Sequence, residues 1–197
     1  MNLSLRWPKH LFTQQQKNNH RGSEASEVFE DWVKLNKNRV TIRPLCHEDA
    51  EGLCHNCFPE ETPEAVVDYI KRALKFVERG QAAHLVAESN GEPIANAQLI
   101  CWHKRAEIGS LVVAEPYRGQ GIGTALIDAL SQAAADLGAE QIEIGAEKNN
   151  PRALDLYRRL GFVAYKEIQI PRRDQKDEHI VYLIKQIPSN GDNGSKL

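Results

Sequence analysis

The stretch that decides the fold of this chain is Arg118-Gly119-Gln120-Gly121-Ile122-Gly123-Thr124-Ala125-Leu126. A strand-like apolar run at 108–113 comes before it, and an amphipathic helical pattern follows it up to Gly138. Glycines between a strand and a helix remove side chains from the turn, so backbone N–H groups can approach a ligand closely. The unpaired N–H groups and the positive dipole end of the helix favour an anion there. The stretch therefore predicts a binding loop for a phosphorylated cofactor.

Two well-known phosphate loops do not fit this stretch. A Walker A loop requires Lys-Ser/Thr after its last glycine, whereas Gly123 is followed by Thr124-Ala125. The dinucleotide fingerprint G-x-G-x-x-G places its third glycine one position later, although Glu143 stands where a ribose-binding acid would be. In the dinucleotide fold the strand also runs almost directly into the glycines, whereas here the turn 114–117 intervenes.

Length and composition limit the possible classes. The chain has 197 residues, of which 41% are hydrophobic and 26% charged, as in an ordinary globular protein with one sizeable core. The net charge of −2 gives no indication of a nucleic-acid partner. No apolar run is long enough to span a membrane, and residues 1–8 lack the apolar core of a signal peptide. We therefore expect a cytoplasmic protein with no nucleic-acid or membrane partner.

The chain divides into three segments. Residues 1–38 are a polar extension with one short amphipathic helix candidate at 24–35, and residues 188–197 have the composition of a disordered tail. Residues 39–187 form the predicted folded domain. Periodicity and turn signals predict helices and strands in the order β-α-α-β-β-β-α-β-α-β-β, with strands at 40–45, 81–88, 93–102, 106–113, 141–146, 162–170 and 179–184 and helices at 49–58, after Thr62, at 121–137 and at 150–160.

A second motif lies further along the chain: Asn150-Pro151-Arg152-Ala153-Leu154-Asp155-Leu156-Tyr157-Arg158-Arg159-Leu160-Gly161-Phe162. It resembles N-x-x-A-x-x-L-Y-x-x-x-G-F, and Arg118-x-x-Gly121-x-Gly123 resembles Q/R-x-x-G-x-G/A. Both are signatures of the GCN5-related N-acetyltransferase (GNAT) family, and the resemblance covers residues 39–187. It implies the α/β (α+β) GNAT fold, a mixed, mostly antiparallel sheet of about seven strands flanked by about four helices. It also implies transfer of an acetyl group from acetyl-CoA to a primary amine.

The resemblance further implies which residues bind acetyl-CoA. Main-chain groups of the strand before the loop would pair with the pantetheine arm, because this strand diverges from the next one in the family. A main-chain N–H near Val113 would stabilise the thioester oxyanion. Asn150 matches a cofactor-contacting asparagine, although it is equally suited to cap the following helix. The implied cofactor-binding residues are Leu111, Val112, Val113, Arg118, Gly119, Gln120, Gly121, Ile122, Gly123, Thr124 and Asn150.

Two residues are the expected catalytic groups. Tyr157 matches the tyrosine that protonates the departing CoA thiolate, and its alternative role is that of a core aromatic residue. Glu107 precedes Arg118 by eleven residues, where histone-type members carry their general base. Strand alternation predicts that Glu107 shares a face with Gly109, Leu111 and Val113. Its alternative role is that of an exposed charge near a strand start.

Other residues stay candidates for the base. Members that act on ribosomal-protein N-termini carry a base on the following strand, where this chain has Gly145. Glu143 and Glu147 flank that position on the same strand face. His84 and His103 are further candidates, and both are expected to be ordinary strand residues.

The acceptor stays open at this level. The resemblance implies an acceptor pocket shaped by the loop 57–64 and the last strand pair, for a small-molecule or peptide amine. The three glutamates of that loop are suited to attract a cation, and equally to complement a helix dipole. Lysine side chains, protein N-termini, polyamines and small antibiotics all remain possible, and the protein is expected to be a monomer or homodimer. A catalytically silent acyl-CoA sensor is the alternative function.

The cysteines suggest one more alternative. Cys54-His55-Asn56-Cys57, with Cys46-His47 upstream, offers ligands for zinc, but no second C-x-x-C exists to complete a usual structural site. We expect buried thiols and no metal, and a zinc-dependent interaction module is the competing hypothesis.

Overall fold

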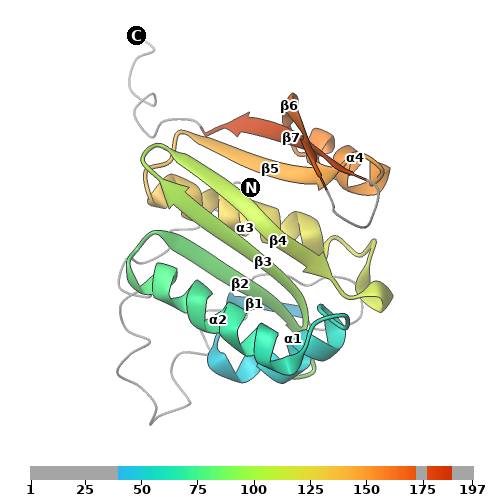
Figure 1. The fold of residues 1–197 in the computed structure, drawn as a ribbon. Coiled ribbons are helices and arrows are strands. Elements are labelled where there is room, and N and C mark those ends of the chain that lie inside the picture. The colour runs from blue at the N-terminus through green and yellow to red at the C-terminus, as the bar shows by residue number, and fades with distance from the viewer. Residues whose placement is uncertain (1–39, 172–176, 188–197) are drawn as a thin grey trace.

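The computed structural model describes residues 40–171 and 177–187 (Figure 1). The expected helix at 24–35, the N-terminal extension and the tail from 188 lie outside the described residues. The described residues form a 7-stranded sheet in the order β1-β2-β3-β4-β5-β7-β6. Neighbouring strands are antiparallel except for β4 and β5, which are parallel and joined through α3.

The predicted order of helices and strands is confirmed, with small shifts at the ends of elements. The strands are β1 (Val40–Pro44), β2 (Ala82–Ser89), β3 (Glu92–Trp102), β4 (Arg105–Val113), β5 (Gln141–Glu147), β6 (Val163–Ile170) and β7 (Glu178–Gln186). The α-helices are α1 (Ala50–Asn56), α2 (Pro63–Glu78), α3 (Ile122–Asp136) and α4 (Pro151–Arg159), and short 3-10 turns are η2 (His47–Asp49) and η3 (Glu115–Tyr117).

Helices cover both faces of the sheet. In Figure 1, α1 and α2 lie on the viewer's side and α3 lies behind the sheet. The helices α1 and α2 bury a small core that includes Leu53, Ile70 and Val86. The helices α3 and α4 pack on the other face over a larger core that includes Leu126 and Leu154. Since α1 packs on β3 and α2 on β2, their cover stops short of β5, β7 and β6.

Local sequence signals act as predicted at three chain reversals. The hydroxyl of Thr62 accepts the Ala65 N–H at 3.2 Å and so caps α2. Asn90 and Gly91 both have positive φ, 54° and 85°, which is the backbone that a tight hairpin between β2 and β3 requires. The Asn150 carbonyl oxygen accepts the Ala153 N–H at 3.1 Å, so this side chain does cap α4.

A β-bulge in β4 corrects one expectation about side-chain direction. Gln98 pairs with Gly109 and Asn96 with Val112, so β4 carries one residue more than β3 between these pairs. Ser110 takes φ 50° within the bulge. The extra residue reverses the alternation, and Val112 packs in the α1–α2 core whereas Leu111 packs in the α3–α4 core. The prediction that Glu107 shares a face with Leu111 and Val113 is therefore wrong, because the side chains of these two residues lie on the α3–α4 face.

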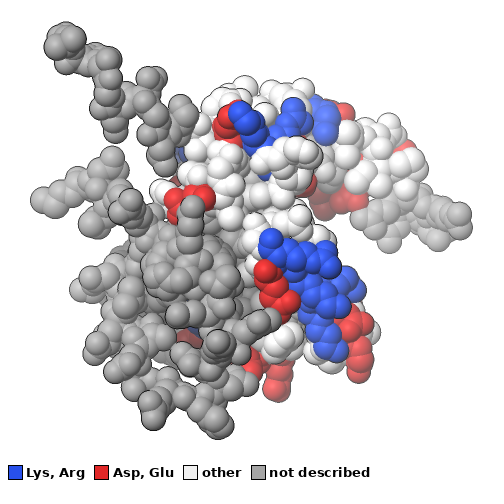
Figure 2. All heavy atoms as spheres, turned by 90° about the vertical axis from the view of Figure 1, so that its left-hand side faces the viewer, with Lys and Arg blue, Asp and Glu red and all other residues white. Residues whose placement is uncertain are grey.

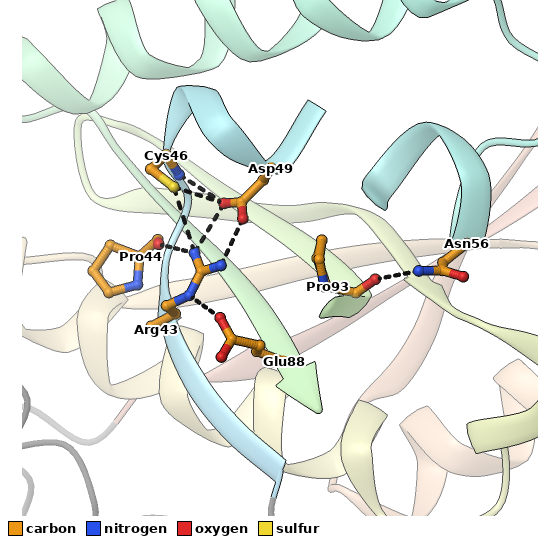
Figure 3. Close-up of polar contacts among 7 residues, drawn as sticks. All are labelled: Arg43, Pro44, Cys46, Asp49, Asn56, Glu88 and Pro93. Atoms are coloured by element: carbon orange, nitrogen blue, oxygen red, sulfur yellow. Dashed lines mark hydrogen bonds and ion pairs between the residues drawn. The ribbon is translucent and has the colours of Figure 1, made fainter. Parts of the chain in front are cut away.

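A buried ion pair ties β1 to the turn that follows it (Figure 3). Two nitrogens of the Arg43 guanidinium donate to the two carboxylate oxygens of Asp49, at 2.6 and 2.9 Å, and its Nε donates to Glu88 at 2.7 Å. The Cys46 N–H also donates to Asp49, whose side chain is 3% exposed. Burial alone would raise the pKa of Asp49, but the hydrogen bonds from Arg43 and Cys46 hold it below its usual value.

Replacing Asp49 should destabilise the fold, because it leaves the Arg43 guanidinium without its buried partner. We expect Asp49→Asn to lower the free energy of unfolding by about 2–4 kcal/mol. Glu88→Gln, which changes the more exposed partner, should cost below about 1 kcal/mol. Because the folded pKa of Asp49 is lowered, its contribution is present above the unfolded pKa and is lost as the pH falls through the folded pKa. Urea unfolding measures all three effects, and equal stability of Asp49→Asn and wild type would contradict this role.

Candidate active site

The two parallel strands at the centre of the sheet separate part of the way along. Their pairing runs from Arg105 with Gln141 to Ile108 with Ile144. Beyond these positions β4 pairs only with β3, and Gly145–Glu147 pair only with β7. The main chain of the second half of β4 therefore has no strand partner on the β5 side, as the resemblance to the GNAT family implied.

The direction of the β4 main chain follows from its pairing with β3. The Ala114 N–H donates to the Ile94 carbonyl of β3 at 2.8 Å. Successive residues of a strand point their polar groups to opposite sides, so the N–H and C=O of Val113 point toward the gap. The Val113 carbonyl there accepts the Nε of Arg118 at 2.9 Å. This contact ties the end of β4 to the start of the glycine loop.

The glycine loop presents free donors at the start of α3. Gly119 and Gly121 have φ 77° and 87°, which a residue with a Cβ adopts only at a cost. The first helical bond runs from the Ala125 N–H to the Gly121 carbonyl, and no side chain caps the helix. Within the described part of the chain, no N–H from 119 to 124 donates to a backbone carbonyl. These amides, close to the gap, suit an anion such as a pyrophosphate.

Gly123 differs from the other two glycines of the loop. It lies within the first turn of α3, and a Cβ there would meet Leu156 at 3.6 Å and Val113 at 3.9 Å, which are ordinary contacts. Neither its backbone nor its surroundings therefore require glycine at this position.

Tyr157 lies on α4 with its ring in the core. The residue is 5% exposed, and its ring packs against Phe162 with centroids 6.3 Å apart. Burial raises the pKa of Tyr157 to about 12, so the hydroxyl is protonated at neutral pH. Among the described residues nothing hydrogen-bonds to this hydroxyl, and it is not one of the fully enclosed unpaired side-chain atoms. The ring is thus a core group, and its hydroxyl is free to donate to a ligand.

Glu107 and Glu143 lie side by side, because they are register partners on the parallel strands β4 and β5. Burial and the nearby Glu143 raise the pKa of the half-buried Glu107, against an opposing effect of Lys166. Glu143 is 6% exposed and accepts the Tyr165 hydroxyl at 2.8 Å, with Arg105 at 3.6 Å. Glu143 is thus held by its contacts with Tyr165 and Arg105, whereas Glu107 is the carboxylate better placed to accept a proton.

Sequence reasoning missed three residues around this pair. Tyr165 is the extra residue of a second bulge, between β6 and β7, and it is 46% exposed. The Nζ of Lys166 lies 4.5 Å from the ring centroid of Tyr182. Nothing in the β6–β7 sequence distinguishes these residues from ordinary alternating strand positions, and only the fold brings them to the carboxylates.

Two side chains of β7 crowd the glycine on β5. A Cβ on Gly145 would lie 3.1 Å from Ile180 and 3.4 Å from the Tyr182 ring. Both neighbours would have to shift slightly to accommodate a side chain at this position.

The remaining candidate bases lie elsewhere. Glu147 is exposed at the end of β5. His84 is buried in β2, where its Nε2 is 2.7 Å from Asn96 Oδ1. His103 is an exposed turn residue with φ 56° between β3 and β4, so the expectation that it is a strand residue is wrong. Its position follows from the sharp reversal of the chain between these two antiparallel strands.

The four cysteines are free thiols, and the expectation that they are buried is confirmed for Cys57 alone, since Cys46, Cys54 and Cys101 are partly exposed. Burial raises the pKa of the Cys57 thiol to about 12, and burial and the nearby Asp49 raise that of Cys46 to about 11. Within residues 40–171 and 177–187 no group of three or more His, Cys, Asp or Glu is placed to hold a metal ion. In the loop 57–64, Glu60, Glu61 and Glu64 are exposed.

Charge on the surface is mixed. In the part of Figure 2 that is not drawn grey, groups of Lys and Arg side chains lie next to acidic ones. No helix of the described chain is long and apolar enough to cross a membrane.

Comparisons with known proteins agree with this geometry. The acetyltransferase (GNAT) family model matches residues 47–162. N-alpha-acetyltransferase 30 of Schizosaccharomyces pombe is 32% identical over 136 residues, which are 66% of this chain and 87% of that protein. An N-alpha-acetyltransferase of Sulfurisphaera tokodaii is 32% identical over 124 residues, covering 56% and 72% of the two chains. An acetyltransferase of Salmonella typhimurium, solved with acetyl-CoA, superposes with a TM-score of 0.63 at 17% identity over 81% of this chain and 100% of its own.

The glycine loop at the start of α3, the gap between β4 and β5 and the matched family model agree with one another, and this chain belongs to the GNAT family as an acyltransferase with acetyl-CoA as its cosubstrate.

Proposed function

We propose that this enzyme transfers the acetyl group of acetyl-CoA to the α-amino group of a polypeptide, by direct attack in a ternary complex. The observation that carries the proposal is the carboxylate pair of Glu107 and Glu143. The pair lies on the same face of the sheet as α1 and α2, in the part that these two helices leave uncovered. The two relatives named N-alpha-acetyltransferase support the choice of acceptor.

The bound cofactor would lie with its pyrophosphate on the amides 119–124 and its pantetheine arm along the main chain of Leu111–Val113. Arg118 would keep the loop and β4 together through the Val113 carbonyl. Asn150 would act as the cap of α4 and so place Tyr157, since its carbonyl oxygen is already bonded to Ala153.

The reaction would need one base and one donor. Glu107 accepts a proton from the acceptor ammonium, and the free amine attacks the thioester carbon. A β4 main-chain N–H stabilises the oxyanion, and the C–S bond breaks as the intermediate collapses. Tyr157 donates its proton to the departing sulfur, and the attacking nitrogen, which must still lose its second proton to become an amide, returns a proton to Tyr157 through solvent. The products are the amide and CoA with a free thiol, and the proton on Glu107 is released to solvent.

An acceptor panel tests this function. Release of free thiol from acetyl-CoA would be measured with N-terminal peptides, lysine peptides, polyamines and aminoglycosides. The proposal expects release with N-terminal peptides and little with Nα-blocked peptides that keep their lysines. Release with polyamines alone would refute the polypeptide acceptor, and no release with any amine would favour a silent acyl-CoA-binding domain.

A charge placed in the glycine loop should weaken cofactor binding. Gly119→Glu puts a carboxylate into open space beside the expected pyrophosphate and should raise the Kd for CoA by roughly tenfold or more. Gly80→Glu is the matched control, because Gly80 also has a positive φ, 67°, and open space around it, but lies between α2 and β2. Calorimetry with both variants separates the effect on the site from backbone strain. Equal affinities would exclude the loop as the phosphate site.

Removing the Tyr157 hydroxyl should affect the rate and not the fold. Since this hydroxyl has no described partner, Tyr157→Phe should keep the melting temperature of the wild type. Loss of the donor to the leaving thiolate should lower kcat by about 10- to 100-fold, with little change in the KM for acetyl-CoA. An unchanged kcat would leave Tyr157 as a core residue alone.

The pH profile should identify the base. The rate rises with pH as Glu107 loses its proton, and the raised pKa of Glu107 places this limb above the range of an ordinary glutamate. Glu107→Gln should remove the limb and lower kcat by about 100-fold or more. Glu143→Gln should keep the limb but move it to lower pH, because a like charge has been removed. Loss of the limb in Glu143→Gln alone would assign the base to Glu143.

A further inference from the structure

We propose that a buried polar cluster of Tyr69, His84 and Asn96 holds the β4 bulge in the shape that directs the free amides of β4 at the acetyl thioester. Asn96 is the positioning residue of this cluster. The inference depends on acetyl-CoA as cosubstrate, and it does not depend on which amine is the acceptor.

The cluster joins three elements to the bulge. Asn96 of β3 is fully buried, and its Nδ2 donates to the Ser110 carbonyl at 2.8 Å and to the Tyr69 hydroxyl of α2 at 3.2 Å. Its Oδ1 lies 2.7 Å from the Nε2 of His84 on β2. The side-chain amide of Asn96 is thus satisfied on both ends, and one of its bonds goes to the bulge itself.

The protonation of His84 follows from these contacts. Only a donor can face Asn96 Oδ1 at 2.7 Å, so the proton lies on Nε2. Burial lowers the pKa of His84 to about 4, and the ring is neutral at physiological pH. The other ring nitrogen, Nδ1, is enclosed without a partner among the described residues. An unpaired buried nitrogen has a cost in stability, which favours a role other than stability for this arrangement.

The bulge needs such support. Ser110 has φ 50°, a left-handed conformation that costs a serine roughly 1 kcal/mol. The bond from Asn96 holds the Ser110 carbonyl in this orientation and offsets the cost. No other side chain of the described residues donates to this carbonyl.

The bulge in turn decides which amides of β4 are free. One residue more or less in a strand exchanges the two sides to which its polar groups and side chains point. With the bulge in place, the N–H of Val113 points to the β5 side, where the strand has no partner. Asn96 therefore acts on the thioester through the backbone, without touching it.

The test observes the thioester directly in the full chain with bound acetyl-CoA labelled with carbon-13 at the carbonyl. Hydrogen bonds from β4 amides should move the carbonyl resonance away from its position in free acetyl-CoA. Asn96→Ala should return it most of the way, while the Kd for 3′-phospho-ADP, which keeps the pyrophosphate of CoA but lacks the pantetheine arm, stays within about threefold of wild type.

Two further variants control for packing and folding. Ser89→Ala removes another buried hydroxyl, which has no described partner, and should leave the resonance unchanged. The double variant Asn96→Ala with Ser110→Gly should recover part of the shift, because glycine adopts the positive φ without strain. If Asn96→Ala does not fold, Tyr69→Phe is the alternative. It keeps the bond from Asn96 to the Ser110 carbonyl but removes the hydroxyl that bonds Asn96 and Ser110, so it should cause a smaller change in the same direction.

An unchanged resonance in Asn96→Ala, or in Tyr69→Phe where only that variant folds, would overturn the proposal and leave a purely structural cluster. The result is independent of the proposed function, because the measurement needs no acceptor. A wild type that binds acetyl-CoA and acetylates no amine would refute that function alone.

Discussion

The separation of β4 from β5 is the feature on which the rest of this structure depends. Two parallel strands that pair at Ile108 and Ile144 and then part leave a row of main-chain groups without strand partners. Such groups are costly to bury alone and are suited to bind an extended ligand. The short turn η3 separates the end of β4 from the glycine loop, and the Arg118–Val113 contact keeps the two together.

The same separation organises the ionisable groups. Where the strands still pair, their register brings Glu107 and Glu143 together, and the last hairpin adds Tyr165 and Lys166. Where the strands have parted, the polar groups are those of the backbone. The first part of β4 therefore carries an ionisable side chain, Glu107, and the second part carries main-chain N–H groups. An acetyl transfer uses both kinds of group, the first to accept a proton and the second to stabilise an oxyanion.

The sequence predicted the parts of the molecule that depend on local chemistry. Three local features each need a particular residue type at one position, and they can therefore be predicted from the sequence. They are the helix cap Thr62 before Pro63, the hairpin turn Asn90-Gly91 and the glycine loop. Periodicity and turn signals predicted the order of elements along the chain, and the two family motifs implied the fold into which they assemble.

The rest depends on pairing between strands, which one chain segment does not show. The residues around Ser110 are like those of a regular strand, so the bulge and the reversed face of Leu111 could not be predicted. The Glu107–Glu143 pair depends on the parallel register of β4 and β5. The position of Tyr165 depends on a second bulge, between β6 and β7. His103 was misplaced because the boundary between strand and turn has no distinct signal there.

The contact of Gly145 with the Tyr182 ring has a consequence for how this enzyme can change over evolutionary time. A side chain at 145 would meet Ile180 at 3.1 Å and the Tyr182 ring at 3.4 Å, so these two side chains of β7 would have to shift to accommodate it. A shift of the Tyr182 ring would in turn disturb its contact with the Lys166 ammonium, whose Nζ lies 4.5 Å from the ring centroid. Substitutions at 145 and 182 are therefore expected to be non-additive, so the effect of one depends on which residue stands at the other.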